Sequence, residues 1–188
     1  MKNENKDTAL LIMDVQAGIL DRVEDKTDFL ARVRSVVDAA HHSPVPVIFV
    51  VVGFRTGMPE ISKRNKMFTG IQDMGDAAKG FIDPKPAIEP ATDDIVVTKR
   101  RVSAFSGSDL EVVLRAKDIR HLVLTGIATS GVVLSTVREA ADKDFGLTVL
   151  SDICSDTDQE VHSLLLTKVF PRQADVMTSE EWTASLQN

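Results

Sequence analysis

Several features that carry chemistry in other proteins are scarce in this sequence of 188 residues. Its one cysteine, Cys154, excludes an intramolecular disulfide and any metal site built from several thiolates. Lysines and arginines number 22 against 28 aspartates and glutamates, so the basic surface typical of a nucleic-acid-binding protein is not expected. No apolar run approaches the roughly 18 residues that a membrane-spanning helix needs. We therefore expect neither nucleic-acid nor membrane binding.

The short motifs of several enzyme classes are also missing. There is no G-x-S-x-G, no phosphate-binding P-loop and no G-x-G-x-x-G after the first apolar run. The four histidines form no His-x-His pair, so we expect no metal site and no cofactor. The amino-terminal stretch MKNENKDTALLIMD has too short an apolar segment and no small-residue cleavage signal for a secretory leader. These absences predict a cytoplasmic protein.

Apolar runs alternate with helical patterns along almost the whole chain, which has 43% hydrophobic residues. Continuous apolar runs indicate strands that are buried on both faces. This alternation predicts one domain over residues 1–188, a doubly wound α/β fold with a mainly parallel sheet. Ligands in such folds bind beyond the carboxyl ends of the strands. The predicted strands cover residues 8–15, 44–52, 93–99, 119–126, 147–152 and 174–178, and the predicted helices cover residues 28–42, 108–118, 129–144 and 158–170.

The stretch from Gly53 to Asp94 interrupts this alternation. It holds four of the seven prolines and shows little periodicity. A connection of this length is uncommon unless it is functional or disordered. We interpret it as an excursion over the carboxyl edge of the sheet, a lid or a partner-contacting arm; a solvated surface loop is the simpler alternative.

Charged residues end two of the predicted strands. Asp14 follows the first strand and Lys99 ends the third. If the two side chains pair, the pairing keeps Asp14 ionised and Lys99 protonated. A paired aspartate can act as a general base or, where it is desolvated, as a general acid. A strand-terminal salt bridge without chemistry is the alternative.

The fourth strand runs into a helix through the small-residue turn of LTGIATSGVVLST, residues 124–136. Backbone N–H groups at the start of a helix suit an oxyanion hole or a bound anion. A simple helix cap by Thr129 or Ser130 is the alternative, with Gly131 allowing close packing. The turn offers no thiol, because Val132 follows Gly131.

The segments TALLIMDVQ, VVTKRRVSAFSGSDLEVVLRA, LVLTGIATSGVVLSTVREAADKDFGLTVLSD and FPRQADV resemble the isochorismatase-like hydrolases, also called the cysteine hydrolase superfamily. The resemblance extends from about Thr8 to Thr178. It implies a three-layer α/β/α sandwich with a six-stranded, Rossmann-like sheet. It also implies a triad of an aspartate after the first strand, a lysine after the third and a cysteine at the helix after the fourth.

Motif matching gives Asp14 and Lys99 the first two roles. The cysteine position falls on Val132, or on the neighbouring Gly131, so no thiol is available for the covalent chemistry of the amidase branch. Cys154 does not substitute, because it is expected just past the fifth strand. The metal motif of nicotinamidases is missing too, since Phe54 and Arg55 stand after the second strand.

The resemblance also includes isochorismatases proper, which have a glycine in place of the thiol and whose aspartate protonates a vinyl ether. By that logic Asp14 is a general acid, Lys99 orients it and binds an anionic group, and Val132 desolvates it. A serine nucleophile at Ser130 lacks a separate base. The candidate substrate-binding residues are Gln16, Phe54, Arg55, Phe105, Ser130, Gly131 and Val132.

The leading hypothesis is a small-molecule hydrolase that uses an Asp–Lys pair, without a cysteine nucleophile, on an anionic metabolite. The alternative is a non-catalytic protein that binds a small ligand, or serves as a scaffold, and keeps the family's pocket. The resemblance further implies a homo-oligomer, with residues 53–94 and the helix after the fourth strand as candidate interfaces.

Overall fold

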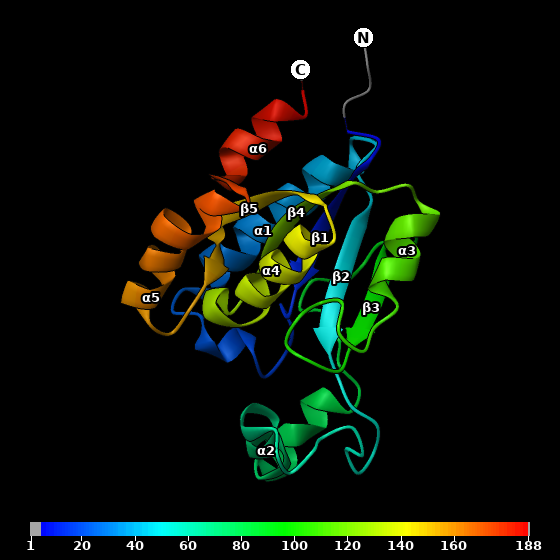
Figure 1. Cartoon of the computed structure of the whole chain (residues 1–188), viewed down its shortest axis with the longest axis vertical. Helices are drawn as coiled ribbons and strands as arrows, with labels where there is room; N and C mark the ends of the chain where they lie inside the picture. The colour runs from blue at the N-terminus through cyan, green and yellow to red at the C-terminus, as the bar shows by residue number, and fades with distance from the viewer. Residues whose placement is uncertain (1–4, 188) are drawn as a thin grey trace.

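The computed structural model describes residues 5–187, without the side chain of Ala77, and contains a six-stranded sheet in which every neighbouring pair of strands is parallel (Figure 1). The strand order is β3-β2-β1-β4-β5-β6. The fold is therefore doubly wound, and the order in which strands are added to the sheet reverses between β1 and β4. The strands are β1 (Thr8–Met13), β2 (Val47–Val52), β3 (Ile95–Lys99), β4 (His121–Ile127), β5 (Gly146–Ser155) and β6 (Asp175–Met177).

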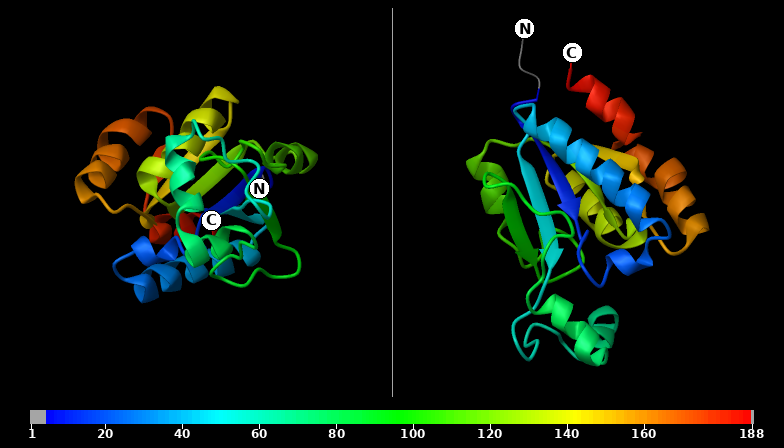
Figure 2. Two further views of the ribbon diagram at one scale, coloured as in Figure 1. Left: turned by 90° about the horizontal axis from the view of Figure 1, so that it is seen from below. Right: turned by 180° about the vertical axis from the view of Figure 1, so that it is seen from behind.

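Helices cover both faces of the sheet, which makes the predicted three-layer sandwich (Figure 2). The helices are α1 (Lys26–His41), α2 (Lys66–Gln72), α3 (Leu110–Ala116), α4 (Leu134–Asp142), α5 (Gln159–Leu164) and α6 (Ser179–Ser185). Shorter helical turns are η1 (Leu20–Arg22), η2 (Gly75–Phe81), η3 (Thr129–Val133), η4 (Leu165–Val169) and η5 (Phe170–Arg172). The predicted fold class is confirmed.

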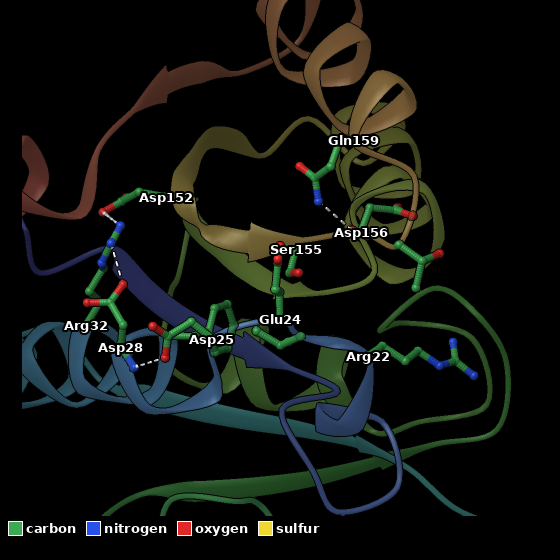
Figure 3. A pocket seen from close by; sticks show the side chains of 12 residues that line it. Arg22, Glu24, Asp25, Asp28, Arg32, Asp152, Ser155, Asp156 and Gln159 are labelled. Atoms are coloured by element: carbon green, nitrogen blue, oxygen red, sulfur yellow. Dashed lines mark hydrogen bonds and ion pairs between the residues drawn. The ribbon is translucent and has the colours of Figure 1, made fainter.

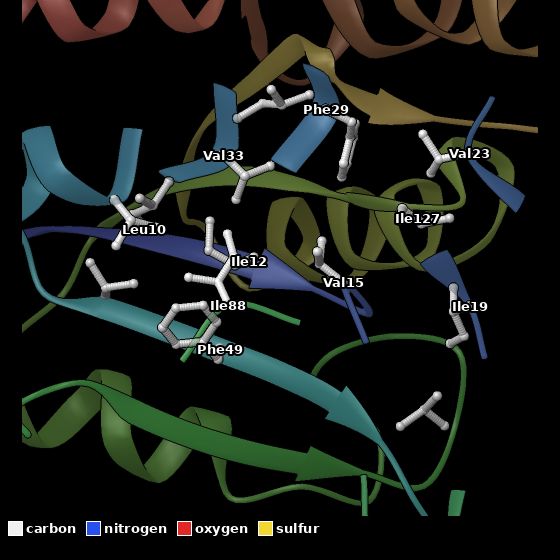
Figure 4. Packing of buried hydrophobic residues seen from close by; sticks show 14 of the residues in the cluster. Leu10, Ile12, Val15, Ile19, Val23, Phe29, Val33, Phe49, Ile88 and Ile127 are labelled. Atoms are coloured by element: carbon white, nitrogen blue, oxygen red, sulfur yellow. The ribbon is translucent and has the colours of Figure 1, made fainter. Parts of the chain in front are cut away.

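Two hydrophobic clusters lie on opposite faces of the sheet because successive side chains of a strand point to opposite sides. Leu10 and Ile12 of β1 pack with Phe29 and Val33 of α1 in the first cluster (Figure 4). Ala9, Leu11 and Met13 pack against α3 and α4 in the second. Both faces of β1 are therefore buried, which explains the continuous apolar run in its sequence.

The excursion over residues 53–94 contains more regular structure than its sequence suggested, namely α2 and η2. Asn65 caps α2 by accepting a hydrogen bond from the Phe68 N–H. The segment lies beyond the carboxyl ends of β2 and β3, where Figure 1 shows α2 below the sheet. Its position agrees with the predicted excursion over the carboxyl edge.

The fifth strand is longer than predicted. β5 continues to Ser155, and a bulge shifts its register so that Cys154 pairs with Gly126 of β4. Cys154 thus lies within the strand, rather than just past it as the sequence suggested. Among residues 5–187, no helix is both long enough and apolar enough to cross a membrane.

Candidate active site

Asp14 and Lys99 meet at the carboxyl edge of the sheet. The Asp14 N–H donates to Val50 O at 2.8 Å, and a left-handed backbone at Asp14 (φ 58°) ends β1 there. Aspartate is among the few residues that tolerate this conformation. The Lys99 Nζ lies 2.9 Å from Asp14 Oδ2, and the two residues are only 1% and 6% exposed. The sheet therefore buries an ion pair beside the point where its strand order reverses.

All three N–H groups of the Lys99 ammonium are occupied inside the protein. Besides Asp14, its Nζ donates to Arg101 O at 3.0 Å and to Val102 O at 2.7 Å. An ammonium group has three donors, so none is left for a ligand. The ion pair with Asp14 leaves Lys99 placed to orient that carboxylate, whereas the expectation that Lys99 also binds an anionic substrate group is not supported by this geometry.

Burial controls the protonation of Asp14. Desolvation raises the pKa of Asp14 to about 6 and outweighs the charge and hydrogen bond of Lys99 and the charge of Arg22, which lower it. The pairing with Lys99 was expected to keep Asp14 ionised. It does favour the ionised form, but burial favours the protonated form more strongly. The Oδ1 atom of Asp14 has no hydrogen-bond partner among the described residues. An aspartate in this state can carry a proton near neutral pH.

A cavity of about 240 Å³ adjoins the ion pair, below the roughly 300–1,000 Å³ of pockets for drug-sized ligands. It is mainly apolar, and Met67, Phe68, Ile71 and Phe81 of the 53–94 excursion form part of its wall. The other lining residues are Asp14, Ile19, Arg22, Val52, Lys99, Val102, Ile127, Ala128, Ser130, Gly131, Val132, Asp156 and Thr157. The dimensions suit a small metabolite.

The turn after β4 lies beside the cavity, as predicted, but two of its backbone N–H groups are not free to bind a ligand. A cis peptide joins Ile127 to Ala128, and the π-type turn η3 follows with a non-helical Gly131. The Ser130 N–H donates to Asp156 Oδ2 at 2.7 Å, and the Gly131 N–H donates to Ala128 O at 3.0 Å. Two N–H groups expected to stabilise an oxyanion are therefore already bonded within the protein.

Asp156 is a site residue that the sequence reasoning missed. Although burial opposes ionisation, hydrogen bonds from the Ser130 side chain and backbone and from the backbone of Asp158 and Thr157 leave the pKa of Asp156 below its usual value. The cavity thus contains two carboxyl groups, one with a raised pKa and one with a lowered pKa. Such a separation is typical of acid–base sites.

Four of the residues predicted to bind substrate do not line this cavity. Gln16 is fully buried and bonds both the N–H and the carbonyl of Val52. Phe54 lies behind the wall, with its ring edge-on to Phe68 at 5.6 Å. Arg55 is exposed and pairs with Glu60 at 2.6 Å.

Phe105, the fourth, belongs to the cluster on the α3 and α4 face, where its ring lies 5.9 Å from that of Phe145. The loop after β3 leads the chain to that face. Ser130, Gly131 and Val132 do line the cavity, together with Asp14 and Lys99. The proximity of β1, β3 and β4 in the strand order explains why these five converge.

The cysteine offers no alternative thiol at this site. Cys154 does not line the cavity, and burial raises the pKa of its thiol to about 12. The thiolate is the reactive form, and this raised pKa disfavours it at neutral pH. Within the part of the chain that the structure describes, no group of three or more His, Cys, Asp or Glu residues is arranged to hold a metal ion.

Comparisons with known proteins agree with this architecture. A family model described as isochorismatase domain matches residues 8–181. The chain is 34% identical over 183 residues to the isochorismatase family protein YecD of Escherichia coli O157:H7, with 94% of each chain covered. It is 30% identical over 173 residues to the ureidoacrylate amidohydrolase RutB of Stutzerimonas stutzeri, covering 78% of this chain and 68% of RutB. The solved structure of an isochorismatase family protein from Burkholderia thailandensis matches with a TM-score of 0.83 and 31% identity, covering 98% of this chain and 97% of the other.

Proposed function

This chain belongs to the isochorismatase family of hydrolases, and we propose that it hydrolyses a small anionic metabolite by proton transfer from Asp14, without a thiol nucleophile. The observation that carries the proposal is the state of Asp14. This carboxyl group is buried beside a small, mainly apolar cavity, its pKa is about 6, and its Oδ1 is unpartnered among the described residues. A general acid works best when its pKa lies near the working pH.

Two further features disfavour acyl transfer through a covalent intermediate. Val132, at the position that resembles the family's cysteine, lines the cavity and has no nucleophilic atom. The Ser130 N–H is bonded to the Asp156 carboxylate, so it does not donate to a developing oxyanion. Both features are compatible with a reaction in which positive rather than negative charge develops on the substrate.

Hydrolysis of an enol ether is such a reaction. Protonated Asp14 gives its proton to the terminal carbon of the C=C bond, whose electron pair forms the new C–H bond, and positive charge spreads onto the ether oxygen. Water adds to the cationic carbon and returns one proton to the Asp14 carboxylate. The hemiketal hydroxyl proton then passes to the ether oxygen as the C–O bond breaks, which releases an alcohol and a ketone. Lys99 holds Oδ2 throughout, which keeps Oδ1 available for proton transfer.

The test compares wild-type protein with Asp14→Asn on isochorismate, nicotinamide and simple amides. We expect release of pyruvate from isochorismate or from another carboxylated enol ether, and a loss of about 10²- to 10⁴-fold in kcat for the Asn variant. Asp38→Asn, an exposed aspartate on α1, is the matched control and should keep full activity. Circular dichroism and thermal unfolding verify that Asp14→Asn remains folded.

The result distinguishes this reaction from its competitors. Ammonia release from an amide by the wild-type protein would support the activity named for RutB and contradict the proposal. Ligand-dependent stabilisation without any product would support a non-catalytic binding protein. Full turnover by Asp14→Asn would also overturn the role of Asp14.

A further inference from the structure

The cavity needs a cation for an anionic substrate, and Lys99 has no donor left to supply one. Arg22 is the other basic residue in the lining. It ends η1, the short helical turn between the Asp14 strand and α1, and its side chain is exposed. Its charge also acts on Asp14, whose pKa it lowers. Arg22 thus lies close enough to influence the proposed proton donor without contacting it.

The backbone at Arg22 is firmly held although its side chain is exposed. The Leu20 N–H donates to Gln16 O at 3.0 Å, and the Arg22 N–H donates to Ile19 O at 3.0 Å. Ile19 and Val23 on either side of η1 are buried in the hydrophobic cluster that covers the α1 face of the sheet (Figure 4). A guanidinium group on a fixed backbone loses less freedom when it binds a ligand.

Arg22 has no ion-pair partner among the described residues, although carboxylates surround it. The reason is visible in the adjoining cavity of about 560 Å³, which Arg22 also lines (Figure 3). There Asp28 and Asp152 both pair with Arg32, and Asp25 caps α1. In Figure 3 the guanidinium of Arg22 extends away from these three carboxylates.

The remaining acidic groups near Arg22 are also accounted for. Asp21 pairs with Lys26, and Asp156 accepts the Ser130 N–H. Glu24 is exposed, and no ion pair involves it among residues 5–187. The acids around Arg22 are therefore largely bonded elsewhere, and its five N–H donors remain available for an external acceptor.

We propose that Arg22 binds a carboxylate of the substrate through paired N–H···O bonds and so restricts the site to carboxylated small molecules. This inference rests on the proposed function for the identity of the site, but it concerns recognition and not proton transfer. The planar fork of arginine matches the two oxygens of a carboxylate. Apolar side chains, among them Ile19 and Phe68, line the same cavity and would hold the substrate's carbon skeleton.

Binding of benzoate and of its neutral isostere benzamide tests this inference without requiring turnover. We expect isothermal titration to give tighter binding of benzoate than of benzamide to the wild-type protein. Arg22→Gln should weaken benzoate binding by about 10- to 100-fold, the range of a charge-assisted hydrogen bond, and leave benzamide binding unchanged. Arg22→Lys keeps the charge but loses the planar guanidinium, so its benzoate affinity should lie between those of the wild-type protein and Arg22→Gln.

Arg34→Gln is the matched control, because Arg34 is an exposed arginine on α1 that lines neither cavity. Its benzoate affinity should equal that of the wild-type protein. Equal benzoate affinities of wild type and Arg22→Gln would overturn the inference, as would wild-type binding of benzoate no tighter than that of benzamide. Arg22-dependent benzoate binding in a protein without turnover would support this inference while contradicting the proposed reaction.

A kinetic experiment separates recognition from catalysis. On a carboxylated enol ether at pH 5, where Asp14 stays mainly protonated with or without the charge of Arg22, Arg22→Gln should raise KM by the same 10- to 100-fold and change kcat little. On the methyl ester of that compound, wild type and variant should have similar KM values. A loss confined to kcat on both compounds would contradict a role in carboxylate binding.

Discussion

Replacement of Lys99 by methionine should raise the pKa of Asp14 further. Methionine keeps a side chain of similar length but removes the ammonium that lies 2.9 Å from Asp14 Oδ2. The charge of Lys99 and its hydrogen bond both lower the pKa of Asp14, whereas burial raises it. Without Lys99, burial acts with only the weaker opposition of Arg22.

The magnitude follows from the geometry of the pair. An opposite charge within about 4–6 Å lowers the pKa of an aspartate by roughly 1–3 units. Starting from about 6, the pKa of Asp14 in Lys99→Met should therefore reach about 7 to 9. That change corresponds to about 1.4–4 kcal/mol of lost preference for the ionised form.

Carbon-13 NMR of the aspartate carboxyl groups measures this shift directly, and the signal that disappears in Asp14→Asn identifies Asp14. The alkaline limb of kcat/KM should move upward by the same amount, because a general acid must be protonated in the free enzyme. The variant also leaves Arg101 O and Val102 O without a donor, at a cost of about 1–3 kcal/mol each, so a urea titration must verify folding.

Titration of Asp14 in folded Lys99→Met at or below its wild-type pKa would refute this reasoning. It would mean that the cavity, and not the ion pair, controls the charge on Asp14. If the NMR titration shifts but the alkaline limb of kcat/KM does not, the effect of Lys99 on the pKa of Asp14 is supported. Asp14 is then not the proton donor of the reaction.

Three stability predictions accompany this one. Folding raises the pKa of Asp14 from 3.8 to about 6, so the stability contributed by its protonation is full below pH 3.8 and is lost as the pH rises through about 6. Between pH 4 and pH 7, Asp14→Asn should lack about 2.4 kcal/mol of this pH dependence in urea unfolding, and identical profiles would exclude the raised pKa. Gly126→Ala should lower the free energy of unfolding by about 3 kcal/mol or more, because the added Cβ would lie 2.3 Å from Met13 O. Gly70→Ala in α2 is the control, because its Cβ meets open space and should not destabilise the protein. Equal effects of the two variants would contradict the close approach of β1 and β4. Asp156→Ala should lower the free energy of unfolding by about 1–3 kcal/mol, because it leaves the Ser130 N–H unpaired. Asp156→Asn should lower it less. An Ala variant as stable as the wild-type protein would show that this hydrogen bond does not contribute to stability.

Local patterns predicted the elements of the sheet well because each strand and helix has its own periodicity. The helix predicted over residues 129–144 buries Val133, Val137 and Ala140 along one stripe, and β1 is buried on both faces. The excursion was harder to predict, because α2 has only seven residues, one of them Gly70, and so shows too short an apolar periodicity. The extension of β5 was missed because it depends on a bulge and on pairing with β4, which a single strand does not encode.

Candidate substrate contacts were less predictable than the strand ends. Arg55 and Phe105 are near the site in sequence, yet one pairs with Glu60 and the other packs on the opposite face of the sheet. Arg22 and Asp156 were missed, although each follows a strand that ends at the carboxyl edge. A search for charged residues just beyond every strand end would have included Asp156, which directly follows β5, but not Arg22, which lies nine residues past the end of β1.

The sequence by itself determined that Asp14 and Lys99 end parallel strands and that no thiol follows β4, because these properties depend on residue identity and local pattern. Only the tertiary structure decided their chemistry. Lys99 is fully bonded by the loop after β3, burial outweighs its charge on Asp14, and Asp156 occupies the Ser130 N–H. Solvation and hydrogen bonding depend on segments brought together from distant parts of the chain, and these interactions set which groups remain free to meet a substrate.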